Sequence, residues 1–522
     1  MNELAILLII ASVGFALSML LRIPSVPLLI AGGFAAARLG FEIKSSDAIT
    51  MLEIGVAFLV FTAGLELNPK RFKHQTRQVF WVAVLQFIIC GFAAFSVARA
   101  LGFETLAATY MGFAVSASST LVVVGHLRSQ QQMFQPFGRL VTGVLLLQDF
   151  AVIFVLVILS AISKGENQIG ISLGGFIVAA LIALFAHYRL IPRLVKKLRT
   201  DDEALLLTGV SVFFIFLAGA SWLNLPIVAG AFLAGFSLAA FPANGLLRGT
   251  LGSLSGFFQA VFFTALGMIL VAPNTEILLD TVALSLLVLV LTPILVAAIF
   301  EFTGQSARTG ISSGLHLAQV SELGIVLAGS GLVTGILTLN QFSVLALVAG
   351  ITMSLTPFIA TDKMAWRLMH WHPGKRNLNA MSKFREHILV LGFGNSGMWV
   401  VKPLQQAGHR ILVVDDDGAV IEELALMGVP CLRGDASDSG VLKFVGATKA
   451  KMILVSIPRL SDILKIIQMA PNIPVIARVF EEAEAEAIRQ AGGIPILNSD
   501  AACETFLEWF ENFTPKEHTA TS

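Results

Sequence analysis

The sequence has 522 residues, of which 56% are hydrophobic and 13% are charged. This composition lies outside the range of soluble globular domains, so it excludes a wholly soluble protein and predicts a polytopic membrane protein with a soluble part attached. The net charge is +1, and no basic block is long enough to suggest a nucleic-acid partner.

The chain starts with an apolar run that we interpret as a membrane helix. The run follows Met1-Asn2-Glu3, which lacks the basic start of a signal peptide, and no small-residue cleavage site follows it. Three cysteines, Cys90, Cys431 and Cys503, form no metal-binding or disulfide pattern. The last two are expected to lie in a reducing cytoplasm.

Thirteen apolar segments are long enough, or nearly so, to cross a bilayer. They are expected at residues 3–21, 25–40, 49–67, 78–98, 105–124, 138–162, 169–188, 204–221, 225–241, 255–272, 277–300, 310–332 and 341–361. Because thirteen is odd, the two termini are expected on opposite sides of the membrane.

The distribution of basic residues selects one orientation. If the C-terminus is cytoplasmic, fourteen Lys and Arg fall in inside loops and four in outside loops. The positive-inside rule therefore predicts an N-terminus outside and a cytoplasmic C-terminal part, in the inner (plasma) membrane. The inside residues are Arg22, Lys70, Arg71, Lys73, Arg77, Arg128, Arg139, Arg189, Arg193, Lys196, Lys197, Arg199, Arg248 and Arg308, and the outside residues are Arg38, Lys44, Arg99 and Lys164.

Segment 5 contains Ser116-Ala117-Ser118-Ser119-Thr120, five small residues that offer hydroxyls and accessible carbonyls. A helix broken there would expose half-helix ends and backbone oxygens, which is how secondary transporters hold ions at mid-membrane. Small residues also suit close helix packing, and the sequence leaves that alternative open.

Segment 6 contains the stretch 143–157, GVLLLQDFAVIFVLV, an apolar run interrupted only by Gln148 and Asp149. A carboxylate at that depth costs about 3 kcal/mol even on lenient insertion scales, so it is expected to face a packed or water-filled interior and to have a function. We interpret Asp149 as the residue that carries the transported ion.

Segment 12 has its own polar interruption, with His316, Gln319, Ser321 and Glu322 in GLHLAQVSELG. Segments 5 and 12 are seven positions apart, and an odd offset gives them opposite orientations, as an inverted repeat of segments 1–6 and 8–13 requires. Glu322 also suits a structural role, hydrogen bonded to Gln319 and Ser321. His316 is expected to be a hydrogen-bonded interface residue rather than a proton relay.

Beyond residue 361 the composition changes. Residues 362–385 suit an interfacial amphipathic piece and a linker, and residues 514–522 a disordered tail. Between them, strands are expected at 387–393, 410–417, 429–435 and 450–457, with helices at 398–408 and 419–428. This alternation predicts a parallel, doubly wound α/β domain over residues 386–513. The fold class is therefore a helical membrane domain over 1–361 plus a C-terminal Rossmann-like domain.

The expected α/β domain begins with a glycine motif, in which Gly392, Gly394, Asn395, Ser396 and Gly397 follow a strand and open a helix. The glycines allow backbone to approach a phosphate at a helix N-terminus. Asp415, at the end of the second strand, is expected to accept hydrogen bonds from ribose hydroxyls and to disfavour a 2′-phosphate. Asp416 is a further candidate, although Asp416 and Asp417 also suit a solvated turn. Together these features predict a nucleotide-binding site.

Six motifs along the chain form a recognisable combination: RIPSVPLLIAGG (22–33), IGVAFLVFTAGLEL (54–67), SASSTLVVV (116–124), LLLQDFAVI (145–153), FFTALGM (262–268) and LAQVSELGIVLA (317–328). The combination resembles the monovalent cation:proton antiporter-2 family and, with the nucleotide-binding part, Kef-type potassium/proton exchangers. The resemblance implies a homodimer and alternating access around crossed, broken helices 5 and 12. It also implies that Asp149 takes either a proton or a metal cation, K⁺ or Na⁺. Ser119, Thr120, Gln148 and Glu322 would line or support the site.

Two departures from the family pattern bear on mechanism. Electrogenic relatives often have two adjacent Asp residues, whereas Gln148 stands at the first place here, so one cation is expected to exchange for one proton without net charge movement. Some relatives place a Lys in the helix before the second crossed segment. Here Thr292-Pro293 occupies the middle of that helix and no Lys or Arg is present in 285–300.

The C-terminal part resembles TrkA-N (regulator of potassium conductance) domains. That resemblance places a second nucleoside contact at Gly434, Asp435 and Ala436. In glutathione-gated Kef proteins an Arg of the glycine loop helps to bind the peptide, but Asn395 stands there in this chain, while a later basic residue is present as Arg478. The regulatory nucleotide is left open among AMP, ATP and NAD(H), and an ancillary subunit is left open as a partner.

Three functions remain to be compared. The favoured one is a nucleotide-regulated cation/proton antiporter. A nucleotide-gated cation channel is the alternative, against which the lack of a TVGYG-like filter counts. The third is a nucleotide sensor with a membrane part that does not transport. An oxidoreductase is not expected, since no substrate domain or catalytic acid accompanies the nucleotide fold.

Overall fold

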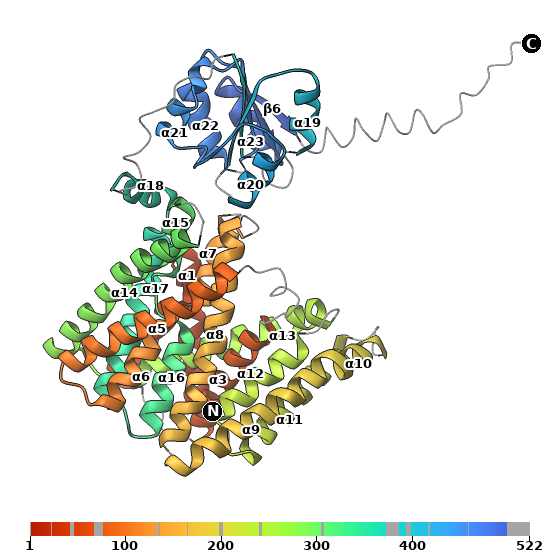
Figure 1. The fold of residues 1–522 in the computed structure, drawn as a ribbon. Coiled ribbons are helices and arrows are strands. Elements are labelled where there is room, and N and C mark those ends of the chain that lie inside the picture. Colours follow the sequence, from red (N-terminus) through yellow and green to blue (C-terminus); the bar gives the residue numbers. More distant parts are fainter. Residues whose placement is uncertain are drawn as a thin grey trace, which may run out of the picture. The chain divides into compact units, whose positions relative to one another are not determined.

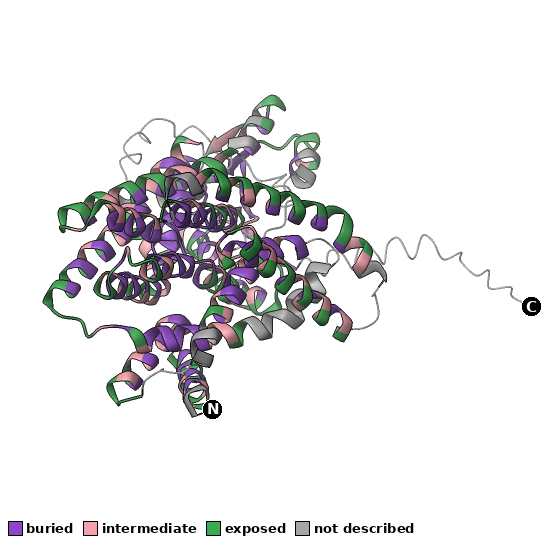
Figure 2. Ribbon diagram, turned by 90° about the horizontal axis from the view of Figure 1, so that it is seen from below, coloured by how far each residue is buried: buried purple, intermediate pink, exposed green. Residues whose placement is uncertain are grey.

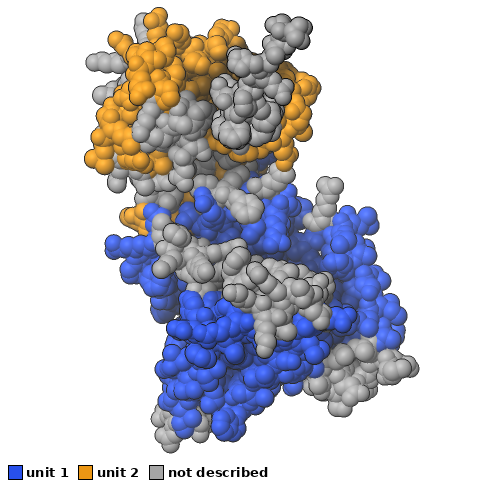
Figure 3. All heavy atoms as spheres, turned by 90° about the vertical axis from the view of Figure 1, so that its right-hand side faces the viewer, with its two compact units in different colours: residues 1–299, 311–365 blue, residues 300–310, 366–522 orange. Residues whose placement is uncertain are grey.

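A computed structural model describes residues 2–21, 23–41, 46–66, 77–130, 132–133, 136–163, 165–197, 202–239, 243–303, 307–371, 386–392, 398–415, 418–457 and 459–497. The chain forms two compact units (Figure 3). The first comprises residues 1–299 and 311–365, and the second comprises residues 300–310 and 366–522.

The first unit is helical, and its helices are labelled in Figure 1. Within the described residues, a helix or a pair of helix halves occupies each of the thirteen predicted segments. The helices are α1 (Asn2–Leu21), α2 (Ser25–Arg38), α3 (Ser46–Glu66), α5 (Arg77–Ala100), α6 (Thr105–Ser116), α7 (Thr120–Ser129), α8 (Pro136–Ser163), α9 (Glu166–Phe185), the π-helical turn η1 (Ala186–Leu190), α10 (Ile191–Lys197), α11 (Asp202–Trp222), α12 (Ile227–Leu238), α13 (Ala243–Ile269), α14 (Thr275–Phe302), α15 (Ala307–Leu317), α16 (Glu322–Val333) and α17 (Leu339–Ile359).

Burial separates central helices from peripheral ones, as the colours of Figure 2 show. In each of the pairs α6–α7 and α15–α16, 78% of the most apolar stretch is buried inside the protein. The buried share of the corresponding stretch is 28% for residues 169–194 and 22% for residues 203–222. The outer helices therefore present apolar side chains outward, as lipid contact requires. The two pairs with polar interruptions lie at the centre.

Both central pairs are interrupted by short extended segments. Between α6 and α7 the backbone is extended at Ala117 and Ser119, and between α15 and α16 it is extended at Ser321. Ser119 and Ser321 then cap the second halves, because each hydroxyl accepts a hydrogen bond from a backbone N–H of the first turn. The predicted break in segment 5 is thus confirmed, and segment 12 is broken in the same way.

The second unit contains a parallel six-stranded sheet with the order β3-β2-β1-β4-β5-β6. Every residue of β1 and β2 is buried, as expected for strands covered by helices on both faces. This confirms the predicted doubly wound domain. The strands are β1 (Ile388–Leu391), β2 (Ile411–Asp415), β3 (Cys431–Arg433), β4 (Met452–Val455), β5 (Val475–Val479) and β6 (Ile494–Leu497), and the helices are α19 (Met398–Gln406), α20 (Gly418–Leu426), α21 (Ser439–Phe444), the 3₁₀ turn η4 (Ala447–Lys449), α22 (Leu460–Met469) and α23 (Glu482–Gln490). Helix α18 (Asp362–Trp371) begins in the first unit and ends in the second.

Several helices extend beyond their predicted ends. Helix α7 continues to Ser129, five residues past the predicted end at 124, and α13 begins at Ala243 rather than 255. Hydropathy marks where a helix leaves the apolar layer, but backbone hydrogen bonding continues through polar residues. The domain boundaries at 361 and 386 stay predictions.

Candidate ion-binding site

The two breaks are joined to each other by backbone groups. The amide of Ser321 donates to the carbonyl of Ala117 at 2.8 Å, and the hydroxyl of Ser118 donates to the carbonyl of Leu317 at 2.7 Å. Thr352 of α17 holds the second break, because its hydroxyl accepts from the amide of Val320 at 3.1 Å. Backbone groups left over where the helices stop are therefore satisfied across the crossing, as buried polar groups require.

Asp149 lies on α8 beside the first break. Its side chain is 1% exposed, and the hydroxyl of Thr120 donates to its Oδ2 at 2.9 Å. Among the residues that the structure describes, its Oδ1 is buried without a hydrogen-bond partner. One oxygen of this carboxylate is therefore held in place while the other is free to bind a ligand.

Gln148 has a supporting position. Its Oε1 accepts from the amide of Ser118 at 3.1 Å, and its Nε2 donates to Oε1 of Gln86 on α5. Gln86 in turn donates to the carbonyl of Ser116 at 3.4 Å. Both ends of the Gln148 amide are thus occupied in fixing the first break. Gln86 was missed by the sequence interpretation, although a lone amide inside an apolar segment is a signal that could have found it.

Glu322 begins α16 and is 4% exposed. Its Oε1 accepts from the amide of Leu121 at 3.4 Å. A carboxylate at the first position of a helix is favoured by the helix dipole. The predicted partners Gln319 and Ser321 bind elsewhere, since Gln319 donates to the carbonyl of Ser119 and Ser321 accepts from the amide of Leu323.

The electrostatic surroundings of Asp149 are acidic. Within the described residues, the charges that act on it are those of Glu322 and of Glu66 at the end of α3. Thr292, at the place where some relatives have Lys, contacts the thiol of Cys90 at 3.7 Å. Glu66 was not among the predicted site residues, because it stands at the end of an apolar segment where charges are common. A buried carboxylate close to other acidic groups favours uptake of a proton or a metal cation.

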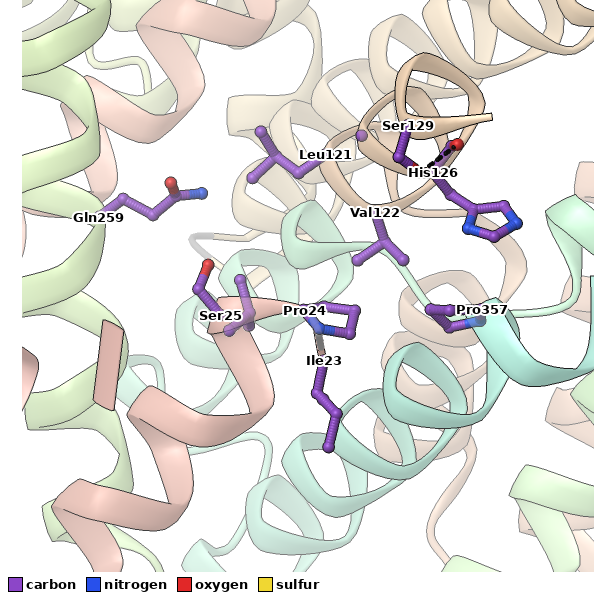
Figure 4. A pocket seen from close by; sticks show the side chains of 11 residues that line it. Ile23, Pro24, Ser25, Leu121, Val122, His126, Ser129, Gln259 and Pro357 are labelled. Carbon is purple, nitrogen blue, oxygen red and sulfur yellow. Dashed lines mark hydrogen bonds between the residues drawn. The ribbon is translucent and has the colours of Figure 1, made fainter. Parts of the chain in front are cut away.

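A cavity of about 330 Å³ begins one residue beyond Thr120 (Figure 4). Its lining residues are Ile23, Pro24, Ser25, Val26, Leu121, Val122, Gly125, His126, Ser129, Gln259 and Pro357. Figure 4 shows Leu121 and Val122 on one side and Gln259 and Ser25 on the other. The cavity therefore follows α7 from the break to the end of the helix.

Two imidazoles lie near this cavity. The ring centres of His126 and His316 are 5.4 Å apart, and His126 Nε2 is 3.2 Å from the carbonyl oxygen of Ala360, the residue that follows α17. His316 is 4% exposed, and its Nδ1 donates to the carbonyl of Ser312 at 2.7 Å. The hydrogen bond of His316 therefore lies within α15, while its ring contacts those of His126 on α7 and Phe137 on α8.

In the second unit, predicted nucleotide contacts gather at the carboxyl ends of β1, β2 and β3. Gly392 is the residue after β1, and its φ of +75° is a conformation that favours glycine. Its amide donates to the carbonyl of Val414. The amide of Gly434 donates to the carbonyl of Asp415, and Ala436 is buried nearby in the chain. The carboxylate of Asp435 accepts from the amide and hydroxyl of Ser437.

The remaining predicted contacts are placed differently. Arg478 lies on β5, which is two strands from β1, and its guanidinium stacks on Phe480 at 5.1 Å. Arg478 is therefore on a different strand from the neighbouring β1, β2 and β3, at whose carboxyl ends Gly392, Asp415 and Gly434 lie. Gly394, Asn395, Ser396, Gly397 and Asp416 lie outside the described residues.

Three known proteins illustrate what the chain is similar to. The glutathione-regulated potassium-efflux system protein KefC of Salmonella schwarzengrund (strain CVM19633) is 28% identical over 475 residues, which cover 86% of this chain and 74% of that protein. The sodium proton antiporter MjNhaP1 of Methanocaldococcus jannaschii has a TM-score of 0.49 and 14% identity, covering 70% of this chain and 96% of that chain. The TrkA-N domain of the inner membrane protein ybaL from Escherichia coli has a TM-score of 0.23 and 21% identity, covering 24% of this chain and 98% of that domain.

The fold and the site define a multi-pass membrane transporter with an attached α/β domain. Residues 5–361 match the family model for the transmembrane part of sodium/hydrogen exchangers, and residues 388–498 match that of TrkA-N domains. The chain belongs to the sodium/hydrogen exchanger family. This confirms the resemblance found in the six motifs and agrees with the expectation of a transporter rather than an enzyme.

Proposed function

We propose that the protein is a monovalent cation/proton antiporter, with K⁺ as the favoured cation, that works by alternating access. The observation that carries this proposal is the carboxylate of Asp149. It is buried beside two crossed breaks, bound by Thr120 through one oxygen, free at the other, and influenced by further acidic groups. Such a group is stable in a low-dielectric interior when a proton or a cation neutralises it.

Exchange follows from competition at this one group. A dehydrated cation beside the carboxylate disfavours its protonation, and a bound proton removes the charge that attracts the cation. Because the two ligands exclude each other, each one must leave before the other binds. Thr120, Ser119, Gln148 and Glu322 would orient or support the group in both states.

The cavity supplies one route to the site. Under the predicted orientation, the end of α7 at Ser129, the start of α2 at Ser25 and Pro357 near the end of α17 lie toward the cytoplasm. The cavity then connects the cytoplasmic side with the residues next to Thr120. We assign it as the inner approach for cation and proton.

Purified protein in proteoliposomes tests the proposed function. An imposed K⁺ or Na⁺ gradient should drive an opposite pH change, measured with an internal pH dye, and a membrane potential alone should leave the exchange rate unchanged. A cation current without proton movement would instead support the channel. Cation and proton fluxes equal to those of empty vesicles would support the non-transporting sensor.

The second unit is proposed to bind a regulatory nucleotide, AMP, ATP or NAD(H). Gly392, Asp415 and Gly434 at the carboxyl ends of neighbouring strands support this, because ligands of such sheets bind at that edge. Gating by glutathione is not proposed, since Asn395 replaces the Arg of the gated relatives.

Replacing Asp415 with Ala should weaken NAD⁺ binding by tenfold or more. The carboxylate would lose charge-assisted hydrogen bonds to the ribose hydroxyls, each worth about 1.5–3 kcal/mol. Titration calorimetry with the purified protein measures the affinity. NADP⁺ serves as the control ligand, because its 2′-phosphate gains nothing from Asp415. Equal NAD⁺ affinity in the variant and the wild type would contradict this role.

We further propose that two copies associate in the inner membrane, with the N-terminus outside and the α/β domain cytoplasmic. Residues 169–194 and 203–222 leave most of their apolar surface uncovered, which either lipid or a second copy would bury.

A further inference from the structure

Gln319 lies in the second break, between α15 and α16, and is 1% exposed. Its Nε2 is 3.4 Å from the carbonyl oxygen of Ser119 and 3.5 Å from that of His316. Both partners are carbonyl oxygens, which only accept hydrogen bonds. The NH₂ end of the amide must therefore face them, and this fixes the opposite direction for Oε1.

The Oε1 atom of Gln319 is buried without a hydrogen-bond partner among the described residues, and the same holds for Oδ1 of Asp149 and Oε2 of Glu322. A buried acceptor left unsatisfied costs about 1–3 kcal/mol, so in native proteins such an atom is usually completed by an ordered water or a ligand.

These three side chains are anchored to three consecutive residues of the first break. Gln319 binds the carbonyl of Ser119, Asp149 binds the hydroxyl of Thr120, and Glu322 binds the amide of Leu121. Each is therefore tied down through one polar atom and retains a second oxygen for another partner. The free oxygens belong to Asp149 on α8, Gln319 in the second break and Glu322 at the start of α16, and the three side chains share adjacent anchor residues.

The ligand chemistry points to an alkali cation. In the described parts of the chain, no three His, Cys, Asp or Glu side chains gather closely enough to hold a metal ion. A dehydrated K⁺ or Na⁺ at Asp149 consequently needs neutral oxygens as well, and carbonyl oxygens replace the hydration shell of these ions in proteins.

We propose that Oε1 of Gln319 is a direct ligand of the transported cation, together with Oδ1 of Asp149 and Oε2 of Glu322. This inference rests on the proposed antiport function and adds a residue from the second break to its cation site. A purely structural Gln319 would need its NH₂ group alone, to hold Ser119 and His316. The two roles differ in which half of the amide matters.

Gln319→Met removes the oxygen at nearly constant volume and should raise the half-saturating cation concentration about tenfold, which corresponds to about 1.4 kcal/mol. Gln319→Glu retains an oxygen there and adds charge, so the half-saturating concentration should stay near that of the wild type or fall. Two measurements apply: proton-coupled flux in proteoliposomes at several K⁺ and Na⁺ concentrations, and the thermal midpoint of the detergent-solubilised protein titrated with the same ions.

Thr281→Val is the matched control, because the hydroxyl of Thr281 on α14 is equally buried and has no hydrogen-bond partner among the described residues, but it has no part in the proposed site. It should leave the half-saturating cation concentration within about threefold of the wild type. If the wild type exchanges cations for protons and Gln319→Met has an unchanged half-saturating cation concentration, the antiporter stands and Gln319 is not a cation ligand. If the wild type lacks exchange, the antiporter fails and the thermal titration decides about Gln319. A wild type that neither exchanges cations for protons nor is stabilised by either cation overturns both.

Discussion

Cation/proton exchange should be abolished when Asp149 is replaced by Asn. The amide keeps an oxygen that can accept from Thr120, so the local packing survives, but the group can no longer carry a charge or release a proton. Removing one partner of a buried ionic contact costs about 3–5 kcal/mol, which corresponds to about 100-fold or more in rate. Both the cation and the proton flux should fall together, because one group carries both.

Proteoliposomes with an imposed cation gradient measure this effect. Asp280→Asn is the matched control, since Asp280 is another Asp in an apolar helix, 8% exposed on α14, and has no part in the proposed site. That variant should exchange like the wild type. If Asp149→Asn still exchanged cations for protons at the wild-type rate, Asp149 would not be the group that binds them. The argument that proton and cation compete for one carboxylate would then fail.

A second large effect is expected from Gly324→Ala. Gly324 lies on α16 against α6, and a methyl group there would overlap the carbonyl oxygen of Ala114. The neighbour is backbone and cannot rotate away, so α16 must shift away from α6 and the bonds across the crossing must lengthen. Overpacking of this kind costs about 3 kcal/mol or more, enough to prevent a stable assembly of the site.

The yield of folded protein and its thermal midpoint in detergent measure this cost. Gly329→Ala on the same helix is the control, because a methyl at Gly329 would meet only the ring of Phe342, at 3.9 Å. The control should behave like the wild type, and it also reports the general effect of Gly→Ala in α16. Equal thermal midpoints for the two variants would show that the close approach at Gly324 does not limit stability.

The broad architecture could be predicted because each part of it leaves a local mark. Thirteen apolar segments were visible as hydrophobic runs, and alternation of strands and helices marked the α/β domain. Asp149 was conspicuous as a lone acid in an apolar stretch. The break at Ser116–Thr120 was visible as a cluster of small polar residues. All of these depend on residues adjacent in sequence.

Hydrogen bonds between residues far apart in the sequence have no such local pattern. The bonds from Ser321 to Ala117 and from Gln86 to Ser116 join residues on different helices, and nothing in the local composition specifies them. For the same reason the sequence left open whether Gln148 lines or supports the site, and in the structure its amide holds the first break in place. Gln319 was assigned to Glu322 by proximity in sequence, although its partners are carbonyls of Ser119 and His316.

Helix α17 is fastened to both broken helices, at Thr352 to the second break and at Ala360 to His126 on α7. If the crossed helices moved as a body past α17, both of these hydrogen bonds would have to break. The less costly course is for α17 to travel with them, which makes it part of the moving element rather than of the stationary frame. The polypeptide leaving Ala360 would then be attached to the moving element and not to the stationary frame.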